Sequence, residues 1–509
     1  MIIMSIKSGG YAGTIVNYFS EQLLERDFTT KRIPFETYAE YISENDIDIV
    51  FIDNMIYESD HSWFEKEIKL LLYHLEKTSI KIVVIKNTRE QIKQLFKGLF
   101  IWEIGDYEKI SYSYNQLKTP VLLNEYLYNP INNKKTIDIL LVKFDKSLSL
   151  NNDFNINRAV SNEILINQVT RERLQELLFK IRKSKIIVLD YNEDIDRNFI
   201  LYLEAIVILT NSIFILEEQY QTLTEYNNRD NKSYMKALLN SDVFMHKNCI
   251  GQNRQKMLEN TLINKRTLKS ILNGEVHNDN INISIITPSI RKSRLPYYIE
   301  QLNRQKLVNI EAILLTHNYT LTSKEKERIR NIAKFKIIII EGDKSQSLGV
   351  CLNKCLDFAS KEFVTKMDDD DYYYANYLID QWIAKKYSQA DVTGKGAHFV
   401  YLENNEMLML RSATKQYKFV KQVIGGSIFC ETEFLKTFQF NDLSSGEDSD
   451  FFKRITSVNK LIYANHPYEM CLFRSKNKDN HTWKIEEIKL IGSSQIVSYG
   501  SPDKYLEVI

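Results

Sequence analysis

Short apolar runs alternate with longer amphipathic stretches through residues 1–275. Runs of this kind predict buried strands, and they fall at Ile2–Ile6, Asp48–Asp53, Lys81–Lys86, Ile137–Lys143, Lys185–Asp190 and Ala205–Leu209. Amphipathic stretches such as Trp63–Lys77 and Thr170–Lys183 predict helices between the strands. The alternation is typical of parallel sheets that are covered by helices. It predicts two Rossmann-like lobes, residues 1–130 and 131–275.

The alternation begins again after a polar run at residues 274–280, which holds a helix-stopping glycine and several turn formers. We therefore expect a domain boundary there and a further α/β domain at residues 281–509. Its pattern predicts a strand that runs into a turn at Ile281–Arg291, further strands at Glu311–Thr316, Phe335–Ile340 and Glu362–Met367, and a helix at Leu348–Ser360. In open α/β sheets ligands bind at the carboxyl ends of the strands. The turns at Thr287–Arg291, Thr316–Asn318 and Asp368–Asp371 are expected to converge there.

The third of these turns is a run of four consecutive carboxylates, Asp368–Asp371. Adjacent negative charges repel one another, and they suit neither a helix face nor a core. At the exposed end of a buried strand they can be neutralised by a divalent cation, because hard cations prefer oxygen ligands. The alternative is a solvated acidic loop that binds nothing.

Composition narrows the class of protein without identifying a reaction. The chain of 509 residues carries 67 basic and 66 acidic side chains, a net charge of +1, which disfavours a general nucleic-acid binder. The 5 cysteines follow no disulfide spacing. No apolar run approaches the roughly 18 residues that span a bilayer, and the N-terminus has no signal-peptide pattern. We expect a cytoplasmic protein without a transmembrane segment, for which contact with the inner face of the membrane stays open.

Six short motifs follow one another in residues 281–509. They are Ile285-Ile286-Thr287-Pro288-Ser289, Gly349 with Asn353, Lys366–Tyr374, Gly394-Lys395-Gly396-Ala397, Gly425-Gly426-Ser427 and Gly446–Arg454. Each motif alone is unspecific, whereas the set in this order resembles family 2 nucleotide-sugar glycosyltransferases with the GT-A fold. The resemblance implies a mixed, mostly parallel central sheet. It also implies a metal-dependent, inverting transfer of a sugar from a nucleotide-sugar donor, with UDP favoured as the nucleotide.

The resemblance implies roles for the acidic run. Asp370 would ligate Mn²⁺ or Mg²⁺, while Asp368 and Asp369 would face the nucleotide ribose and the waters on the metal. Such a cation offsets the negative charge that gathers on a diphosphate leaving group.

Further donor-binding residues follow from the same resemblance, namely Thr287, Pro288, Ser289, Arg291, Asn318, Asn353, Gly426 and Arg474. Arg474 is expected to clamp the diphosphate. His481 is a candidate second metal ligand, and a surface histidine is the alternative. Members of the family often carry an acidic residue after the second strand, where this chain has Thr316-His317-Asn318. The identity of the nucleotide base therefore stays open.

Inverting transfer needs a base that removes the proton of the acceptor hydroxyl. The resemblance implies that Asp448 is this base and that Glu447 orients the acceptor or tunes the base. Helix dipoles also favour carboxylates in the first turn of a helix. A purely structural role of Glu447 and Asp448 is therefore the alternative.

The N-terminal half has its own motifs at Asp48–Asn54, Ile82–Lys86 and Asn124–Pro130. Together with the long polar helix that ends this half, they resemble the two GT-B lobes of spore-maturation-type glycosyltransferases. Where those lobes have a glycine-rich nucleotide-binding turn, this chain has Leu203–Asn211. The resemblance thus implies degenerate, non-catalytic lobes that position the acceptor or mediate assembly.

Two other functions stay open at this point. A sugar-phosphate nucleotidyltransferase would need a glycine-rich basic loop after its first strand, and Thr287–Arg294 has basic residues but no glycine. A non-catalytic glycan- or nucleotide-binding scaffold would not assemble the carboxylates into a metal site. The expected partners are a nucleotide-sugar donor and a hydroxyl of a glycan, a cell-wall polymer or a protein, and a homo-oligomer is left open.

Overall fold

The computed structural model describes two compact units. The first is formed by Met1–Asn129, Lys134–Lys236 and Gln255–His277, and the second by Pro130–Asn133, Ala237–Arg254 and Asn278–Ile509. The residues that the structure describes are 11–15, 30–34, 37–45, 47–53, 65–78, 80–87, 100–104, 111–113, 116–119, 121, 123, 128–132, 134–144, 162–166, 171–190, 197–216, 247, 249–258, 281–475 and 487–508.

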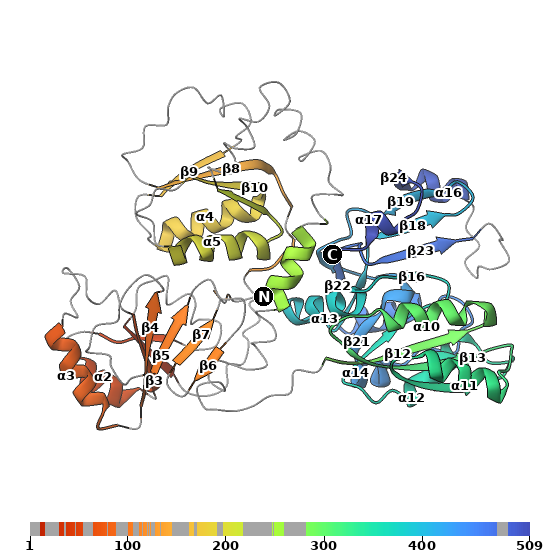
Figure 1. Ribbon diagram of the computed structural model, residues 1–509, viewed down its shortest axis with the longest axis horizontal. Helices are drawn as coiled ribbons and strands as arrows, with labels where there is room; N and C mark the ends of the chain where they lie inside the picture. The colour runs from red at the N-terminus through yellow and green to blue at the C-terminus, as the bar shows by residue number, and fades with distance from the viewer. Residues whose placement is uncertain are drawn as a thin grey trace, which may run out of the picture. The chain divides into compact units, whose positions relative to one another are not determined.

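The first unit contains two sheets (Figure 1). The strands are β1 (Tyr11–Ile15), β2 (Thr30–Arg32), β3 (Ile47–Asp53), β4 (Lys81–Asn87), β5 (Phe100–Ile104), β6 (Ser111–Ser113), β7 (Gln116–Thr119), β8 (Ile137–Phe144), β9 (Asn162–Ile166), β10 (Ser184–Asp190) and β11 (Ile213–Leu216). One sheet has the order β2-β1-β3-β4-β5-β7-β6 and is parallel except at β6–β7. The other has the order β11-β10-β8-β9 and is parallel throughout. The described helices are α2 (Tyr38–Glu44), α3 (Glu65–Leu75), α4 (Arg171–Lys183) and α5 (Arg197–Leu209).

These elements confirm the predicted α/β class, with one exception in the detail. The strand predicted at Ala205–Leu209 is wrong, because these residues form the end of helix α5. A short apolar run reads the same in a buried helix as in a buried strand, and Ala205, Ile206, Val207 and Leu209 are all buried here. The strand predicted at Ile2–Ile6 lies outside the described residues.

The second unit is built on an eight-stranded sheet. Its strands are β12 (Asn282–Ser289), β13 (Asn309–Thr316), β14 (Lys336–Glu341), β15 (Phe363–Lys366), β17 (Val392–Lys395), β20 (Lys418–Val420), β21 (Phe429–Glu431) and β22 (Ile462–Asn465). The order is β14-β13-β12-β15-β21-β17-β22-β20. Strands β14, β13, β12 and β15 run parallel, whereas β21 is antiparallel to both of its neighbours. This is the mixed, mostly parallel sheet that the motifs predict.

A five-stranded sheet in the order β16-β23-β18-β19-β24 completes the second unit. Its strands are β16 (Tyr372–Tyr373), β18 (His398–Leu402), β19 (Met407–Arg411), β23 (Met470–Arg474) and β24 (Ser494–Tyr499). The helices and single turns of this unit are η4 (Lys292–Arg294), α10 (Leu295–Asn303), α11 (Ser323–Ile332), α12 (Leu348–Asp357), α13 (Tyr377–Ser388), η5 (Gly425–Ser427), α14 (Thr432–Phe438), α15 (Glu447–Ser457), α16 (Glu487–Gly492) and α17 (Asp503–Leu506). Among the described helices, none has both the length and the apolar character needed to cross a membrane.

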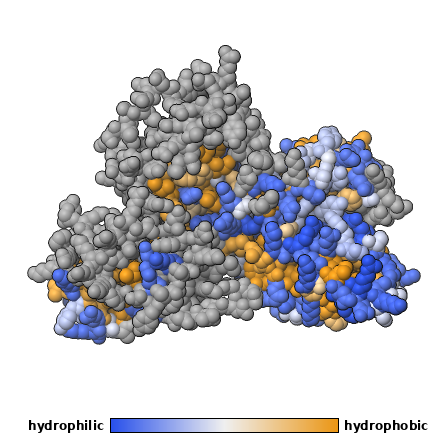
Figure 2. Space-filling model, viewed as in Figure 1, coloured by the Kyte–Doolittle hydropathy of each residue, from blue (hydrophilic) through white to orange (hydrophobic). Residues whose placement is uncertain are grey.

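The strands of the eight-stranded sheet appear in the sequence as continuous apolar runs because they are buried in the core. Every residue of β15 is buried, and so are Ile283, Ile285 and Ile286 of β12. Strands covered on both faces have no polar side to present. On the face drawn in Figure 2, hydrophilic side chains cover much of this unit, with apolar ones between them. Polar residues stand where these strands end, namely Ser289 of β12, Thr316 of β13 and Lys366 of β15.

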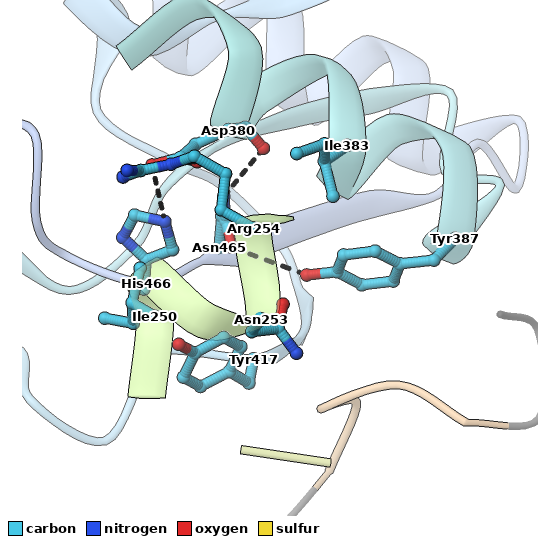
Figure 3. Close-up of a pocket in the computed structure, with 9 residues that line it drawn as sticks. All are labelled: Ile250, Asn253, Arg254, Asp380, Ile383, Tyr387, Tyr417, Asn465 and His466. Carbon is cyan, nitrogen blue, oxygen red and sulfur yellow. Dashed lines mark hydrogen bonds and ion pairs between the residues drawn. The ribbon is translucent and has the colours of Figure 1, made fainter. Parts of the chain in front are cut away.

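A buried ion-pair network braces this unit (Figure 3). Arg254 donates to both carboxylate oxygens of Asp380, at 2.7 and 2.9 Å, and to Glu469 at 3.1 Å. It also donates to the Val508 carbonyl at 3.0 Å, and His466 Nε2 lies 3.1 Å from Asp380. Burial raises the pKa of Asp380, but Arg254 and His466 lower it by more, so that it stays below its ordinary value. One guanidinium thus balances two carboxylates in the interior.

Replacement of Arg254 by methionine is expected to destabilise the protein by about 3–5 kcal/mol, because it removes the guanidinium that pairs with the buried side chains of both Asp380 and Glu469. The free energy of unfolding, measured by urea denaturation of the full chain, checks this. The control is Lys436→Met at the surface pair with Glu433, whose atoms are 3.2 Å apart, where a change below about 1 kcal/mol is expected. An Arg254→Met protein as stable as this control would contradict the prediction.

Candidate active site

The acidic run lies at the carboxyl end of β15, as predicted, and its members are held differently. Asp369 is buried, accepts a hydrogen bond from Ser289 Oγ at 2.5 Å and pairs with Arg291 Nη1 at 2.6 Å. Asp370 is more exposed, and its Oδ2 lies 2.9 Å from Arg291 Nη2. Burial raises the pKa of Asp369, and Arg291 opposes this shift. The turn after β12 therefore holds two of the four carboxylates through one arginine.

Asp371 points to a different part of the unit. Its Oδ1 accepts a hydrogen bond from the backbone N–H of Phe473 at 3.3 Å, and the side chain is buried. Burial and repulsion by Asp370 and Asp368 raise its pKa well above the ordinary value. Asp371 thus ties the acidic turn to β23.

The second acidic motif begins helix α15. Gly446 precedes the helix with φ of 76°, a left-handed conformation that side chains disfavour. Glu447, the first helical residue, is buried, whereas Asp448 is half-buried and accepts a hydrogen bond from the Ser449 N–H at 2.7 Å. Of the two acids, Asp448 is thus the one whose carboxylate can be reached from outside.

Two consecutive glycines of η5 bring the two motifs together. A Cβ on Gly426 would lie 2.7 Å from Asp368 Oδ2, and a Cβ on Gly425 would overlap the carboxylate of Asp448. Tyr373 adds a link, since its hydroxyl accepts a hydrogen bond from the Asp368 N–H at 2.9 Å and donates to the Gly426 carbonyl at 2.8 Å. The carboxylates of Asp368 and Asp448 therefore stand over adjacent residues of a single turn.

Lys366, the last residue of β15, is a member of this site that sequence reasoning missed. Its Nζ lies 3.3 Å from Glu447 Oε1 and 3.6 Å from Asp368 Oδ1. Burial lowers the pKa of Lys366, but Asp368, Glu447 and Asp448 together raise it by more, so the ammonium is charged. In the sequence Lys366 begins the motif Lys366–Tyr374, but a lysine just before the acidic run does not by itself indicate which carboxylates it pairs with.

The donor set fits a divalent cation by its chemistry. Burial raises the pKa of Asp368, Lys366 lowers it, and repulsion by Asp370 and Asp448 raises it again, which marks a concentration of negative charge. Carboxylate oxygens are the ligands that Mg²⁺ and Mn²⁺ prefer, and Mg²⁺ is commonly held by one or two carboxylates plus substrate phosphates. Within the described residues, no three His, Cys, Asp or Glu side chains form a complete protein site for a metal. Asp368 and Asp370 are the carboxylates of this turn that could contribute oxygen ligands to such a cation.

The remaining predicted residues of the first strand support the site from inside. Thr287 is fully buried, and its hydroxyl donates to the Met367 carbonyl at 2.8 Å and bonds Tyr298 Oη at 2.6 Å. Pro288 follows it within β12. Ser289, besides its bond to Asp369, accepts one from the Tyr319 hydroxyl at 3.0 Å.

The hydrogen bond from Tyr319 to Ser289 joins the turn after β13 to the end of β12. Asn318 lies in the former, with φ of 68°. At the end of β23, burial lowers the pKa of Arg474, while Asp371 and Asp370 raise it, which puts the guanidinium within electrostatic reach of the acidic turn.

Asn353 is not brought to the carboxylates. Both polar atoms of its amide bond the backbone of Phe440, at 2.8 and 2.9 Å, so the side chain braces α12 against the segment before α15. His481 lies outside the described residues.

An aromatic cluster adjoins the acidic turn. Tyr372 contacts Tyr297 and Phe473, with ring centroids 5.4 and 4.9 Å apart. Arg294 lies over Tyr297 and Phe473, and it donates to the Asp370 carbonyl at 3.3 Å. These rings pack against β23 and support the turn from the side of the five-stranded sheet.

Comparisons with known proteins give partial likenesses. No protein-family model matches the chain, and no curated protein matches it. Among solved structures, the chain is similar to the mannosyltransferase PcManGT from Pyrobaculum calidifontis in complex with GDP-Man and Mn²⁺, at 12% identity and a TM-score of 0.31, over 39% of this chain and 58% of that one. It is similar to S. aureus TarS at 19% identity and a TM-score of 0.30, over 38% and 37% of the two chains.

A fragment of the same S. aureus protein, TarS 1-349 in complex with UDP-GlcNAc, matches at 18% identity and a TM-score of 0.31, over 42% of this chain and 64% of that one. The chain thus spans less than two thirds of each of these structures. Likenesses of this size do not assign a function to this chain.

Gly426→Ala tests whether the close packing of the Asp368 carboxylate on Gly426 matters for nucleotide binding. The added methyl is expected to push Asp368 aside, because the Asp368 side chain is 37% exposed and has room to turn. We expect affinity for UDP in the presence of Mn²⁺, measured by calorimetry, to fall at least about tenfold (about 1.4 kcal/mol). Gly492→Ala is the matched control, since nothing lies within 4 Å of its added Cβ. Unchanged affinity in Gly426→Ala would show that the position of Asp368 does not matter for binding.

Proposed function

We propose that residues 281–509 are a metal-dependent, inverting glycosyltransferase. The enzyme would move a sugar from a nucleotide-sugar donor, first of all a UDP-sugar, to a hydroxyl of a glycan, a cell-wall polymer or a protein. The observation that carries this proposal is the meeting of the two acidic motifs at η5, where Asp368 packs on Gly426 and Asp448 on Gly425. Inverting transfer needs two functions side by side, charge stabilisation at the leaving group and proton removal at the acceptor.

On the donor side, Asp370 and Asp368 are the residues that would hold Mn²⁺ or Mg²⁺, and the bound cation would supply charge compensation for the departing diphosphate. Arg291 orients Asp370 and Asp369 through its two ion pairs. Arg474, electrostatically coupled to Asp370, is suited to bind a diphosphate oxygen.

On the acceptor side, Asp448 removes the proton of the attacking hydroxyl. The hydroxyl oxygen forms the new bond to the anomeric carbon as the bond from that carbon to the diphosphate oxygen breaks, and the diphosphate leaves with the electron pair. Glu447 is buried and paired with Lys366 at 3.3 Å. We therefore assign Glu447 to orienting the first turn of α15 and Asp448 to the proton transfer.

For the N-terminal lobes, residues 1–130 and 131–275, we propose a non-catalytic role in positioning the acceptor or in assembly. Support comes from the run Leu203–Asn211, most of which belongs to helix α5 and is buried. A nucleotide-binding turn would need exposed backbone N–H groups at a helix start.

Calorimetric titration with UDP, with and without Mn²⁺, tests the donor half. We expect binding that depends on Mn²⁺ and that falls at least about tenfold in Asp370→Asn, because the variant keeps the shape and loses the charge. A panel of UDP-GlcNAc, UDP-glucose, UDP-galactose and GDP-mannose, scored for metal-dependent hydrolysis, then identifies a usable donor.

Asp448→Asn tests the acceptor half. The variant is expected to bind UDP with Mn²⁺ like the wild type and to hydrolyse the donor on the order of 10²-fold more slowly, as loss of a general base predicts. Wild-type hydrolysis rates in this variant would remove Asp448 as the base.

The wild type also distinguishes the two other candidate functions. UDP binding with the same affinity in the presence and absence of Mn²⁺ would favour a binding scaffold, and exchange of pyrophosphate with a nucleotide sugar would favour a nucleotidyltransferase.

A further inference from the structure

Lys366 carries a charge into the interior beside the candidate active site. Its side chain is 5% exposed, as is that of Glu447, and the two meet at 3.3 Å. The same ammonium lies 3.6 Å from Asp368. One cation therefore contacts a carboxylate from each acidic motif.

This arrangement couples two elements that are far apart in the sequence. Glu447 opens helix α15 and Asp448 follows it directly. A buried carboxylate is stable only when it is paired, and removal of one partner of a buried pair is strongly unfavourable. The ion pair between Lys366 and Glu447 therefore also holds in place the first turn of α15, from which Asp448 projects.

The geometry points to Lys366 as a positioning residue for the proposed transfer, which anchors Glu447 and so sets where the carboxylate of Asp448 stands relative to Asp368. The inference rests on the proposed function and deepens it. Lys366 acts through Glu447 and not on the reacting atoms, because its ammonium is enclosed between the two motifs. A misplacement of about 1 Å in a catalytic group can cost about 10²-fold in rate, so the anchor matters for turnover more than for donor binding.

A merely structural lysine would behave differently. Its loss would lower stability and leave the turnover of each folded molecule unchanged. Lys385 of helix α13 offers this comparison, since its side chain is 12% exposed and its ammonium lies 3.1 Å from Glu431. It is a largely buried lysine of the same unit whose carboxylate partner belongs to neither acidic motif.

The experiment compares Lys366→Met, Lys366→Arg and Lys385→Met in the 509-residue chain. The probe is the nucleotide sugar of the panel that the wild type hydrolyses fastest with Mn²⁺, and kcat, KM and the Kd of UDP are measured. Lys366→Met is expected to lower kcat at least about tenfold while KM and the Kd of UDP stay within about threefold. Lys366→Arg, which keeps the charge, is expected to recover part of kcat, and Lys385→Met to keep kcat per folded molecule within about twofold.

The double variant Lys366→Met/Glu447→Gln covers the case in which Lys366→Met does not fold. It removes both buried charges, and replacing both partners of a buried pair is far less harmful than removing one. It is expected to fold, to bind UDP with Mn²⁺ and to show the same loss of kcat, because the anchor of α15 is gone.

A kcat within about twofold of the wild type in a folded Lys366→Met or in the double variant would overturn the positioning role and leave the proposed function standing. An equal loss of kcat in Lys385→Met would also overturn the positioning role. A wild type that neither binds UDP with Mn²⁺ nor hydrolyses any sugar of the panel would overturn the proposed function itself, and the positioning role with it.

Discussion

Carboxylates that gather at the end of a buried strand persist only where positive charge is held against them. Two cations do this at the end of β15. Arg291, from the turn after β12, pairs with Asp369 and Asp370, and Lys366, from β15 itself, pairs with Glu447 at the start of α15. The charge balance thus joins three elements, and the geometry of the candidate active site follows from it.

The sheet that carries this site was largely predictable, because parallel strands covered on both faces leave continuous apolar runs. Predicted strands such as Glu311–Thr316 and Glu362–Met367 fall within about two residues of β13 and β15. The same rule fails at Ala205–Leu209, where an equally apolar run is the end of a buried helix. An apolar run indicates that a segment is buried, whereas the length of the run and the residues that flank it decide between a helix and a strand.

The site was predictable as a set of residue types but not as a set of contacts. The acidic run can be recognised in the sequence, since four carboxylates after an apolar strand have few structural uses. The roles of Lys366 and Tyr373 cannot be recognised there, because each depends on a partner more than fifty positions away in the sequence. Asn353 shows the converse, since its amide is used by the backbone of Phe440. Periodicity tells which side chains are polar, whereas three-dimensional pairing decides which of them face a substrate.

The Tyr373 hydroxyl has a mechanical consequence. It bridges the backbone of Asp368 and the carbonyl of Gly426 with two hydrogen bonds, of 2.9 and 2.8 Å. The main chain of Asp368 is therefore held at a set separation from the glycine turn on which both carboxylates pack. A small adjustment that a reacting pair of molecules demands on this side must come from torsion about the χ angles of Asp368, while its backbone stays tied to that turn.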